Sequence, residues 1–359
     1  MERKIALLFD PYLDTLGGGE RYILTVASLL SQQNYQVILA WHNLDDLRQA
    51  TSRFGINLDA VEISEEHYRL FTSPVNLLDK RRALKDFDLI FFVSDGSIPF
   101  LFSKNNLLHY QVPFTKSPGP KFLYQLKLLS IQHLIVNSDF TKKVTDRTLS
   151  TDRCQVIYPP VDTASLTNTT PKEKLILNVG RFASPSHSKR QDILISAFRQ
   201  LVDGGGLHDW KLILAGGQKN DDSVLPELKD QARGYPIDFI VNPDYLALKK
   251  IYAKSTLYWH AAGYDVDENL NPEAVEHFGI TTVEAMAAGC VPLVIDKGGQ
   301  REILTPDSGF LVTSIEQLAK STHDLIAHPA KLKAMRTKAV SRAQNFSVAT
   351  FTDQFLKLL

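Results

Sequence analysis

The segment from residue 276 to residue 289 combines a turn, a helix start and two carboxylates, and it reads Glu276-His277-Phe278-Gly279-Ile280-Thr281-Thr282-Val283-Glu284-Ala285-Met286-Ala287-Ala288-Gly289. The two glutamates stand eight positions apart on either side of the Gly-containing turn. The first N–H groups of a helix lack partners and, together with the helix dipole, attract phosphate. Carboxylates beside such an anion site can bind hydroxyl groups. The segment therefore indicates a ligand that is part sugar and part pyrophosphate.

Short apolar runs alternate with patterns of helical period on both sides of this segment. In the N-terminal half we expect strands at Ile5–Phe9, Gln36–Ala40, Leu89–Val93, Leu107–Val112, His133–Val136 and Gln155–Tyr158, and helices at Glu20–Ser31, Lys121–Leu129 and Phe140–Leu149. In the C-terminal half we expect strands at Leu175–Val179, Trp210–Ala215, Ile237–Val241, Thr256–His260 and Val291–Asp296, and helices at Asp192–Leu201, Tyr245–Ala253 and Thr282–Ala288. Because such alternation forms parallel βαβ units, it predicts an α/β fold with doubly wound sheets.

The stretch between the two halves, residues 159–171, is rich in Pro and hydroxyl residues, as linkers are. At 359 residues, the chain is long enough for two domains of roughly 150 residues each. We expect Rossmann-like domains at 1–160 and 174–345, joined by a linker at 161–173, with ligands bound in a central cleft between them. The last helix, 346–359, carries Phe351 and Phe355 on one face, and we expect it to pack back towards the N-terminal domain.

The composition excludes several classes of protein. Apolar residues make up 44% of the chain and charged residues 22%, which is typical of a globular protein. Lys+Arg and Asp+Glu both total 40, so no net charge favours nucleic acid as a partner. The N-terminal apolar run is too short for a signal peptide, and no run reaches the roughly 20 residues of a membrane span. The two cysteines, Cys154 and Cys290, lack metal-ligand spacing. We therefore expect a cytoplasmic protein, with room for peripheral contact at a membrane face.

Three glycines follow the first expected strand and precede its helix. Gly17, Gly18 and Gly19 let the backbone approach a ligand closely, because no Cβ is in the way. They do not fit G-x-G-x-x-G, since Arg21 and Tyr22 follow, so a nicotinamide dinucleotide site is disfavoured. A plain strand-to-helix turn is the alternative for this loop.

Two cations flank the loop after the strand at Leu175–Val179. Arg181 ends that strand, and Lys189 opens the next helix. Arg can bind two oxygens of a pyrophosphate while Lys supplies a mobile point charge. A solvated basic loop is the alternative, and the loop is not a Walker A motif.

For the acidic residues, helix capping or simple exposure to solvent is an alternative to ligand binding. Thr281 and Glu284 fit the Thr-x-x-Glu capping box, which offers Glu284 a structural role, whereas Glu276 has none. Asp265 and Asp267 form a D-x-D sequence in a Gly/Asn/Pro-containing loop, which we interpret as solvated. We expect no metal site.

These motifs together resemble the retaining glycosyltransferases of family 4, which have the GT-B fold of two facing Rossmann-like domains. The resemblance covers nearly the whole chain and rests on Gly17–Arg21, Asn137-Ser138, Tyr158–Asp162, Gly180-Arg181 with Lys189, and Glu276–Glu284. The second domain is especially similar to enzymes that transfer mannose from GDP-mannose to lipid-linked oligosaccharides. One departure is the spacing of eight positions between Arg181 and Lys189, which is longer than the commonest spacing in the family.

The resemblance implies a role for each site residue. Arg181 and Lys189 would neutralise the donor diphosphate, and Glu276 would hold sugar hydroxyls. Glu284 would bind the ribose. Gly17 and Gly18 would let their loop close over the phosphates. His109 would face the transferred sugar, although a hydrogen-bonded histidine at a strand end is the alternative. The distal phosphate would be held by the amides of Gly279, Ile280, Thr281 and Thr282.

The implied activity is transfer of a hexose from a nucleotide-diphosphate sugar, with GDP-mannose as the best guess, to a saccharide or lipid-linked acceptor. No further cofactor or metal would be needed, and the configuration would be retained. Two alternatives stay open: a GT-B nucleotide-sugar epimerase or hydrolase, and a non-catalytic nucleotide-sugar-binding subunit.

A basic and aromatic stretch between Phe100 and Ile135 bears on the acceptor. It contains Lys104, Lys116, Lys121 and Lys127 and no acidic residue. Such a surface can rest on anionic lipid headgroups, which would suit a lipid-linked acceptor. A helix that packs its apolar side on the sheet, with its lysines in water, is the alternative.

Overall fold

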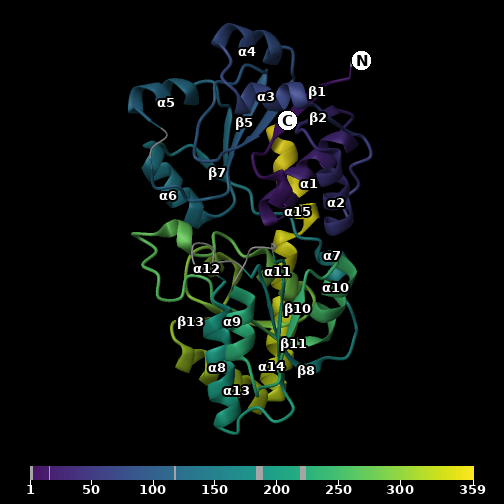
Figure 1. Cartoon of the computed structure of the whole chain (residues 1–359), viewed down its shortest axis with the longest axis vertical. Coiled ribbons are helices and arrows are strands. Elements are labelled where there is room, and N and C mark those ends of the chain that lie inside the picture. Colours follow the sequence, from purple (N-terminus) through teal and green to yellow (C-terminus); the bar gives the residue numbers. More distant parts are fainter. Residues whose placement is uncertain (1–2, 16, 117–118, 183–188, 219–223) are drawn as a thin grey trace. The chain divides into compact units, whose positions relative to one another are not determined.

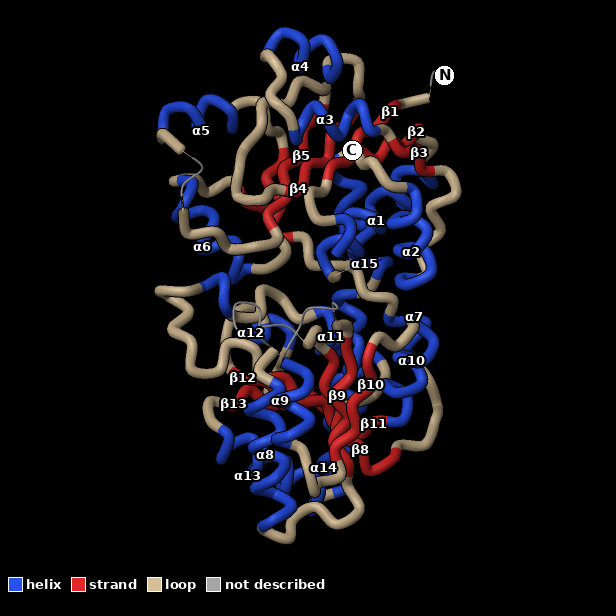
Figure 2. Tube along the Cα trace, viewed as in Figure 1, coloured by secondary structure: helices blue, strands red, loops and turns tan. Residues whose placement is uncertain are grey.

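The computed structural model describes residues 3–15, 17–116, 119–182, 189–218 and 224–359, and its contacts divide the chain into two units. The first unit contains Met1–Pro160 and Phe351–Leu359, and the second contains Val161–Thr350. Each unit is built around one parallel sheet, as predicted from the alternating pattern. Figures 1 and 2 show the two sheets and the helices that cover them.

The first sheet has seven parallel strands in the order β3-β2-β1-β4-β5-β6-β7. The strands are β1 (Ile5–Phe9), β2 (Gln36–Ala40), β3 (Val61–Ile63), β4 (Leu89–Val93), β5 (Asn105–Tyr110), β6 (His133–Val136) and β7 (Cys154–Val156). The expected strand at Leu107–Val112 therefore begins two residues earlier and ends two residues earlier. Strand β3 was not predicted, because three residues are too few to show a period.

Helices cover both faces of this sheet. They are α1 (Gly18–Gln32), α2 (Leu44–Phe54), α3 (Glu65–Thr72), α4 (Leu77–Leu84), α5 (Lys121–Leu128) and α6 (Asp139–Leu149). Successive residues of β1 alternate between two apolar cores: Ala6 and Leu8 belong to the core that contains α1, whereas Leu7 and Phe9 belong to the core that contains α5. This alternation follows from the two-residue period of a strand and explains why both faces are apolar.

The C-terminal helix α15 (Val348–Phe355) and the 3-10 turn Leu356–Leu358 complete the core of the first unit. Phe351 meets the Tyr22 ring edge-on at 5.0 Å between centroids, and Phe355 lies 5.9 Å from Phe91. The side-chain amide of Asn105 donates to the carbonyl of Leu358 at 2.8 Å. The last residues of the chain are therefore a structural part of the N-terminal unit.

The second sheet has six parallel strands in the order β10-β9-β8-β11-β12-β13. The strands are β8 (Glu173–Val179), β9 (Lys211–Gly216), β10 (Ile237–Val241), β11 (Ser255–His260), β12 (Val291–Ile295) and β13 (Phe310–Val312). The helices are α8 (Gln191–Asp203), α9 (Val224–Gln231), α10 (Tyr245–Lys254), α11 (Ile280–Ala287), α12 (Gln300–Ile303), α13 (Ile315–Ala327) and α14 (Pro329–Ala343). In both sheets the strand order reverses beside the first strand, which is the Rossmann arrangement.

The stretch that was expected to be a linker is folded within the second unit. It contains the short helix α7 (Thr163–Leu166), and Val161 is fully buried and pairs with Ser347 in an isolated bridge. The Thr163 hydroxyl also donates to the Gln344 side chain at 2.9 Å. Apolar residues are few in this stretch, but those present are used for packing.

Candidate functional site

The site lies at the strand-order reversal of the second unit, where β8 and β11 are neighbours. Ligands of open α/β sheets bind at this point, because the loops that leave the two strands turn to opposite faces. Strand β8 leads into the loop that carries Arg181 and Lys189, and β11 ends at His260. Glu276 precedes helix α11. These side chains, far apart in the sequence, gather at one edge of the sheet.

Glu276 is the centre of the cluster. Its Oε2 accepts from Lys189 Nζ at 2.7 Å and from His260 Nε2 at 3.0 Å. Burial alone would raise the pKa of this carboxyl, but the charge of Lys189 and the hydrogen bond from His260 hold the pKa well below its usual range. Among the described residues nothing donates to Oε1. Glu276 is therefore a charged acceptor with one oxygen held in place and the other available.

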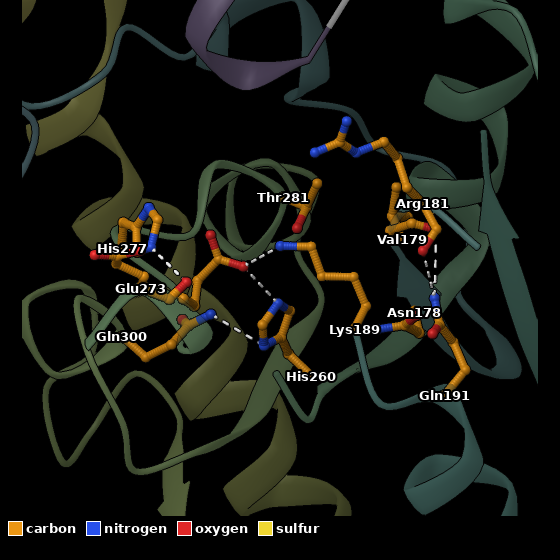
Figure 3. Close-up of polar contacts among 12 residues, drawn as sticks. Asn178, Val179, Arg181, Lys189, Gln191, His260, Glu273, His277, Thr281 and Gln300 are labelled. Atoms are coloured by element: carbon orange, nitrogen blue, oxygen red, sulfur yellow. Dashed lines mark hydrogen bonds and ion pairs between the residues drawn. The ribbon is translucent and has the colours of Figure 1, made fainter. Parts of the chain in front are cut away.

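His260 and Gln300 continue this network behind the carboxylate. The Gln300 side-chain nitrogen lies 3.3 Å from His260 Nδ1, and both residues are at most 1% exposed. Figure 3 shows Lys189 and the His260 ring approaching the same carboxylate oxygen from two sides, with Gln300 beside the ring on the side away from Lys189. Sequence reasoning assigned neither His260 nor Gln300 to the site. Two features of the sequence could have indicated them. His260 is a polar residue at the end of an apolar strand, and Gln300 follows Gly298-Gly299 at the start of a helix.

The start of helix α11 offers unpaired amides beside this cluster. Gly279 caps the helix with φ +118°, and a Cβ there would lie 2.8 Å from the Gln300 side-chain nitrogen, so only glycine fits. The amide of Thr282 donates to the Gly279 carbonyl at 3.0 Å. Of the four amides expected to hold phosphate, Thr282 is therefore already bonded, and those of Ile280 and Thr281 have no acceptor among the described residues.

The capping box expected at Thr281 and Glu284 is wrong. The helix begins at Ile280 after Gly279, so Thr281 already lies inside it and cannot be its cap. The Thr281 hydroxyl instead accepts from Tyr258 at 2.7 Å, and Glu284 Oε2 accepts from the Tyr252 hydroxyl at 2.9 Å. Glu284 therefore does not cap the helix, and its orientation is fixed by the tertiary hydrogen bond from Tyr252.

The two cations of the basic loop differ in whether they have an ion-pair partner. Lys189 is ion-paired with Glu276, whereas Arg181 is exposed and its guanidinium has no partner among the described residues. The side chain of Gln191 donates to the Arg181 carbonyl at 3.1 Å and so ties the two ends of the loop together. A Cβ on Gly180 would lie 2.8 Å from Lys189 Cγ, which explains the glycine. Residues 183–188 lie outside the described part of the chain.

The glycine loop of the first unit is ordered by side chains around it. The Gly17 amide donates to Glu20 Oε2, which closes the first turn of α1. The close approach falls on Gly19, where a Cβ would lie 1.8 Å from the Gln111 side-chain oxygen. Gly17 and Gly18 open the helix, and no contact of these two with a ligand group is defined by the protein alone.

His109 lies in the apolar core of the first unit, not at an open strand end. It is fully buried in β5, and its ring stacks on Tyr22 at 4.1 Å between centroids. Burial lowers the pKa of His109 to about 3, although the Ile135 backbone opposes this shift, so the ring is neutral at pH 7. The alternative, a hydrogen-bonded histidine at a strand end, is not seen either, because neither ring nitrogen has a hydrogen-bond partner among the described residues. The ring must become accessible before it can act on a substrate.

The acidic D-x-D sequence forms a local turn. Asp267 Oδ1 accepts from the Asn269 amide at 2.9 Å. In the part of the chain that the structure describes, no three His, Cys, Asp or Glu side chains are grouped so that they could hold a metal ion. Nor is any helix of the described residues both long and apolar enough to cross a membrane.

Comparison with protein-family models covers most of the chain. Residues 16–165 match the model described as Glycosyltransferase Family 4, and residues 166–342 match the model described as Glycosyl transferases group 1. The boundary between the two matches lies close to the division between the two structural units.

Several relatives are mannosyltransferases with the same name. The chain is 30% identical over 243 residues to the GDP-Man:Man(3)GlcNAc(2)-PP-Dol alpha-1,2-mannosyltransferase of Xenopus laevis, a match that covers 62% of this chain and 47% of that protein. The human protein of the same name is 27% identical over 273 residues, covering 71% and 51%. The chain thus spans about half the length of the curated relatives it matches.

Solved structures with the same fold are more distant in sequence. HepE of Anabaena, solved in complex with UDP and glucose, has a TM-score of 0.71 at 18% identity and covers 99% of this chain and 98% of its own. A glycosyltransferase of Rickettsia africae has a TM-score of 0.77 at 17% identity, covering 100% and 98%. The two Rossmann-like units are therefore those of the GT-B fold.

Proposed function

Because the chain belongs to the glycosyltransferases of family 4, we propose that it transfers a hexose from a nucleotide-diphosphate sugar to a saccharide or lipid-linked acceptor. The observation that carries this proposal is the Glu276–Lys189 pair beside the open amides of Ile280 and Thr281. Cations and amides suit a diphosphate, and a carboxylate with an available oxygen suits sugar hydroxyls.

The chemistry follows from where charge develops. Cleavage of the bond between the sugar and the diphosphate leaves an oxocarbenium-like sugar and adds negative charge to the departing phosphate. Arg181 and Lys189 would stabilise that charge, together with the amides of Ile280 and Thr281. Glu276 Oε1 would hold sugar hydroxyls, and Glu284, oriented by Tyr252, would accept from the ribose hydroxyls. These roles require Lys189 to turn from Glu276 towards the phosphate.

For the donor we propose GDP-mannose, since the names of the mannosyltransferase relatives specify GDP-mannose as their donor. We also propose that the configuration is retained and that the reaction needs no metal. Cations and helix amides neutralise the leaving diphosphate without one. His109 is kept as a candidate only for an opened state of the first unit, because its ring is buried in the apolar core.

We propose further that the first unit contacts an anionic membrane surface at the cytoplasmic face, which would bring it to a lipid-linked acceptor. Phe122 and Leu129 of the α5 region are 80% and 77% exposed, and Leu78 of α4 is 68% exposed. Burial lowers the pKa of Lys80 to about 8, and the nearby charge of Lys127 contributes to this shift. Exposed apolar side chains beside lysines that have no ion-pair partner among the described residues suit anionic headgroups, whose negative charge would favour the protonated lysines.

Vesicle flotation tests this contact. The protein should float with vesicles containing phosphatidylserine at low salt, and Phe122→Ser with Leu129→Ser should abolish flotation. A protein that stays at the bottom of the gradient with these vesicles would refute the membrane contact, whether or not it transfers sugar.

Thermal shift with GDP, UDP, ADP and their sugars tests the donor. A ligand that binds the folded state raises the melting temperature more, at a given concentration, the lower its Kd, so GDP-mannose should give the largest shift. A chain that is stabilised by none of these compounds would not be a nucleotide-sugar enzyme.

A further inference from the structure

His260 lies behind the proposed donor site, and neither the family models nor the sequence motifs assign it a role. It is the last residue of β11 and is 1% exposed. Its ring faces Glu276 on one side and Gln300 on the other, at 3.0 Å and 3.3 Å. Each nitrogen of this buried ring therefore has a polar partner.

The partners determine which ring nitrogen carries the proton. A carboxylate only accepts hydrogen bonds, so the Nε2 that faces Glu276 must be the N–H. In the neutral ring Nδ1 then has a lone pair, and the Gln300 amide is placed to donate to it. Gln300 is itself fully buried against Gly279, where a Cβ would lie 2.8 Å from the same amide nitrogen. The orientation of the ring is therefore built into the start of helices α11 and α12.

The hydrogen bond from His260 to Glu276 becomes important when the donor binds. This part of the argument rests on the proposed function. Lys189 is the only cation paired with Glu276 among the described residues. When Lys189 turns to the diphosphate, the buried carboxylate loses its counter-charge. A buried carboxylate without a partner tends to take up a proton or swing away. The remaining donor to Glu276 is then His260 Nε2.

We propose that His260, fixed by Gln300, is a positioning residue that keeps Glu276 in place as a hydroxyl acceptor after Lys189 has moved to the phosphate. His260 itself touches no substrate, because Glu276 and Gln300 cover its two nitrogens. Its effect should therefore fall on the part of the ligand that Glu276 recognises, the sugar, and not on the nucleotide.

Calorimetric binding of GDP and GDP-mannose to three proteins tests the proposal, with UDP and UDP-glucose measured in parallel. Wild type should bind the nucleotide sugar with an affinity that His260→Met lowers about 10- to 100-fold, the range for losing a hydrogen bond to a charged group. GDP, which has no sugar, should bind His260→Met as it binds wild type. His260→Gln places an amide N–H close to the former Nε2 and should restore most of the sugar-nucleotide affinity.

Each outcome of this experiment is decisive. Equal losses for GDP and GDP-mannose, or no rescue by His260→Gln, would show that His260 only supports the fold, and the proposal would be overturned. If wild type binds none of the four compounds, the proposed function itself fails, which is a distinct result. The ¹⁵N shifts of the imidazole give a second readout: the Nε2–H tautomer is expected, and the Nδ1–H tautomer would refute the arrangement.

Discussion

The Tyr252 hydroxyl in α10 donates to Glu284 Oε2 in α11 at 2.9 Å, and this bond decides how one of the two glutamates is presented. Tyr252 is 1% exposed, and burial followed by the charge of Glu284 raises its pKa well above the usual range, so the phenol stays protonated and remains a donor. The two glutamates that stand eight positions apart are thus held by different means, Glu276 by a lysine and a histidine and Glu284 by a tyrosine.

Tyr252→Phe should weaken nucleotide binding, because Glu284 loses the bond that orients it towards the ribose. The expected loss of GDP affinity is about 3- to 10-fold, less than for a hydrogen bond lost from the ligand itself, because the ligand is affected only through the orientation of Glu284. Isothermal calorimetry measures it, with Tyr235→Phe as the matched control, since the Tyr235 hydroxyl donates to Asp203 at the surface. Equal affinity in wild type and Tyr252→Phe would contradict the role of Glu284.

Glu276→Gln should reduce sugar transfer by about 10- to 100-fold, because an uncharged amide accepts more weakly from sugar hydroxyls than a carboxylate. Steady-state rates with GDP-mannose and a saccharide acceptor measure the change. Glu62→Gln is the control, since Glu62 is exposed and bonds to Gln36 outside the site. An unchanged rate would remove Glu276 from the site.

Arg181→Ala should lower kcat by about 100-fold, the cost of losing one group that stabilises charge in the transition state. The melting temperature should change little, because Arg181 is exposed and unpaired among the described residues. Arg233→Ala is the control, since Arg233 forms an exposed ion pair with Asp230. A variant that keeps its full rate would show that Arg181 is only a solvated loop residue.

Phe355→Ala should destabilise the protein by about 3–5 kcal/mol, as expected for a buried aromatic side chain. Phe355 is fully buried against Phe351 and Phe91, so the cost falls on the first unit although the residue follows the second unit in the sequence. Urea unfolding followed by circular dichroism measures it. Leu359→Ala, at a residue 36% exposed, should cost far less; similar losses in both variants would contradict the packing described.

Asp10 should make the stability of the first unit fall as pH rises. Burial, then the charge of Glu20, raise the pKa of Asp10 to about 8 in the folded protein, from 3.8. The folded state therefore binds the proton more tightly, so this stability is fully present below pH 4 and is lost as pH rises through 8. Urea unfolding at pH 5 and pH 8 should show a smaller difference for Asp10→Asn than for wild type. The control Asp59→Asn, at an exposed residue, should keep the wild-type difference.

Much of the fold followed from local patterns. The expected strands at Ile5–Phe9 and Leu89–Val93 have the bounds observed, because apolar runs between turns report burial on both faces of a parallel sheet. Strands β3 and β13 escaped prediction because they are only three residues long. The capping box failed for a different reason: a Thr-x-x-Glu spacing is compatible with a cap, but Tyr258 and Tyr252 hold these two side chains elsewhere.

By itself, the sequence determined the two parallel sheets and a helix soon after Gly279, since periods, turns and glycines act over a few residues. That helix begins at Ile280, two residues before the expected start at Thr282. Only the tertiary structure decided which groups share a hydrogen bond. Lys189 reaches Glu276 across 87 positions, and Gln300 reaches His260 across 40. It also placed His109 inside the core, where its ring stacks on Tyr22. Such contacts depend on how folded strands and helices bring distant side chains together, and no local pattern records that distance.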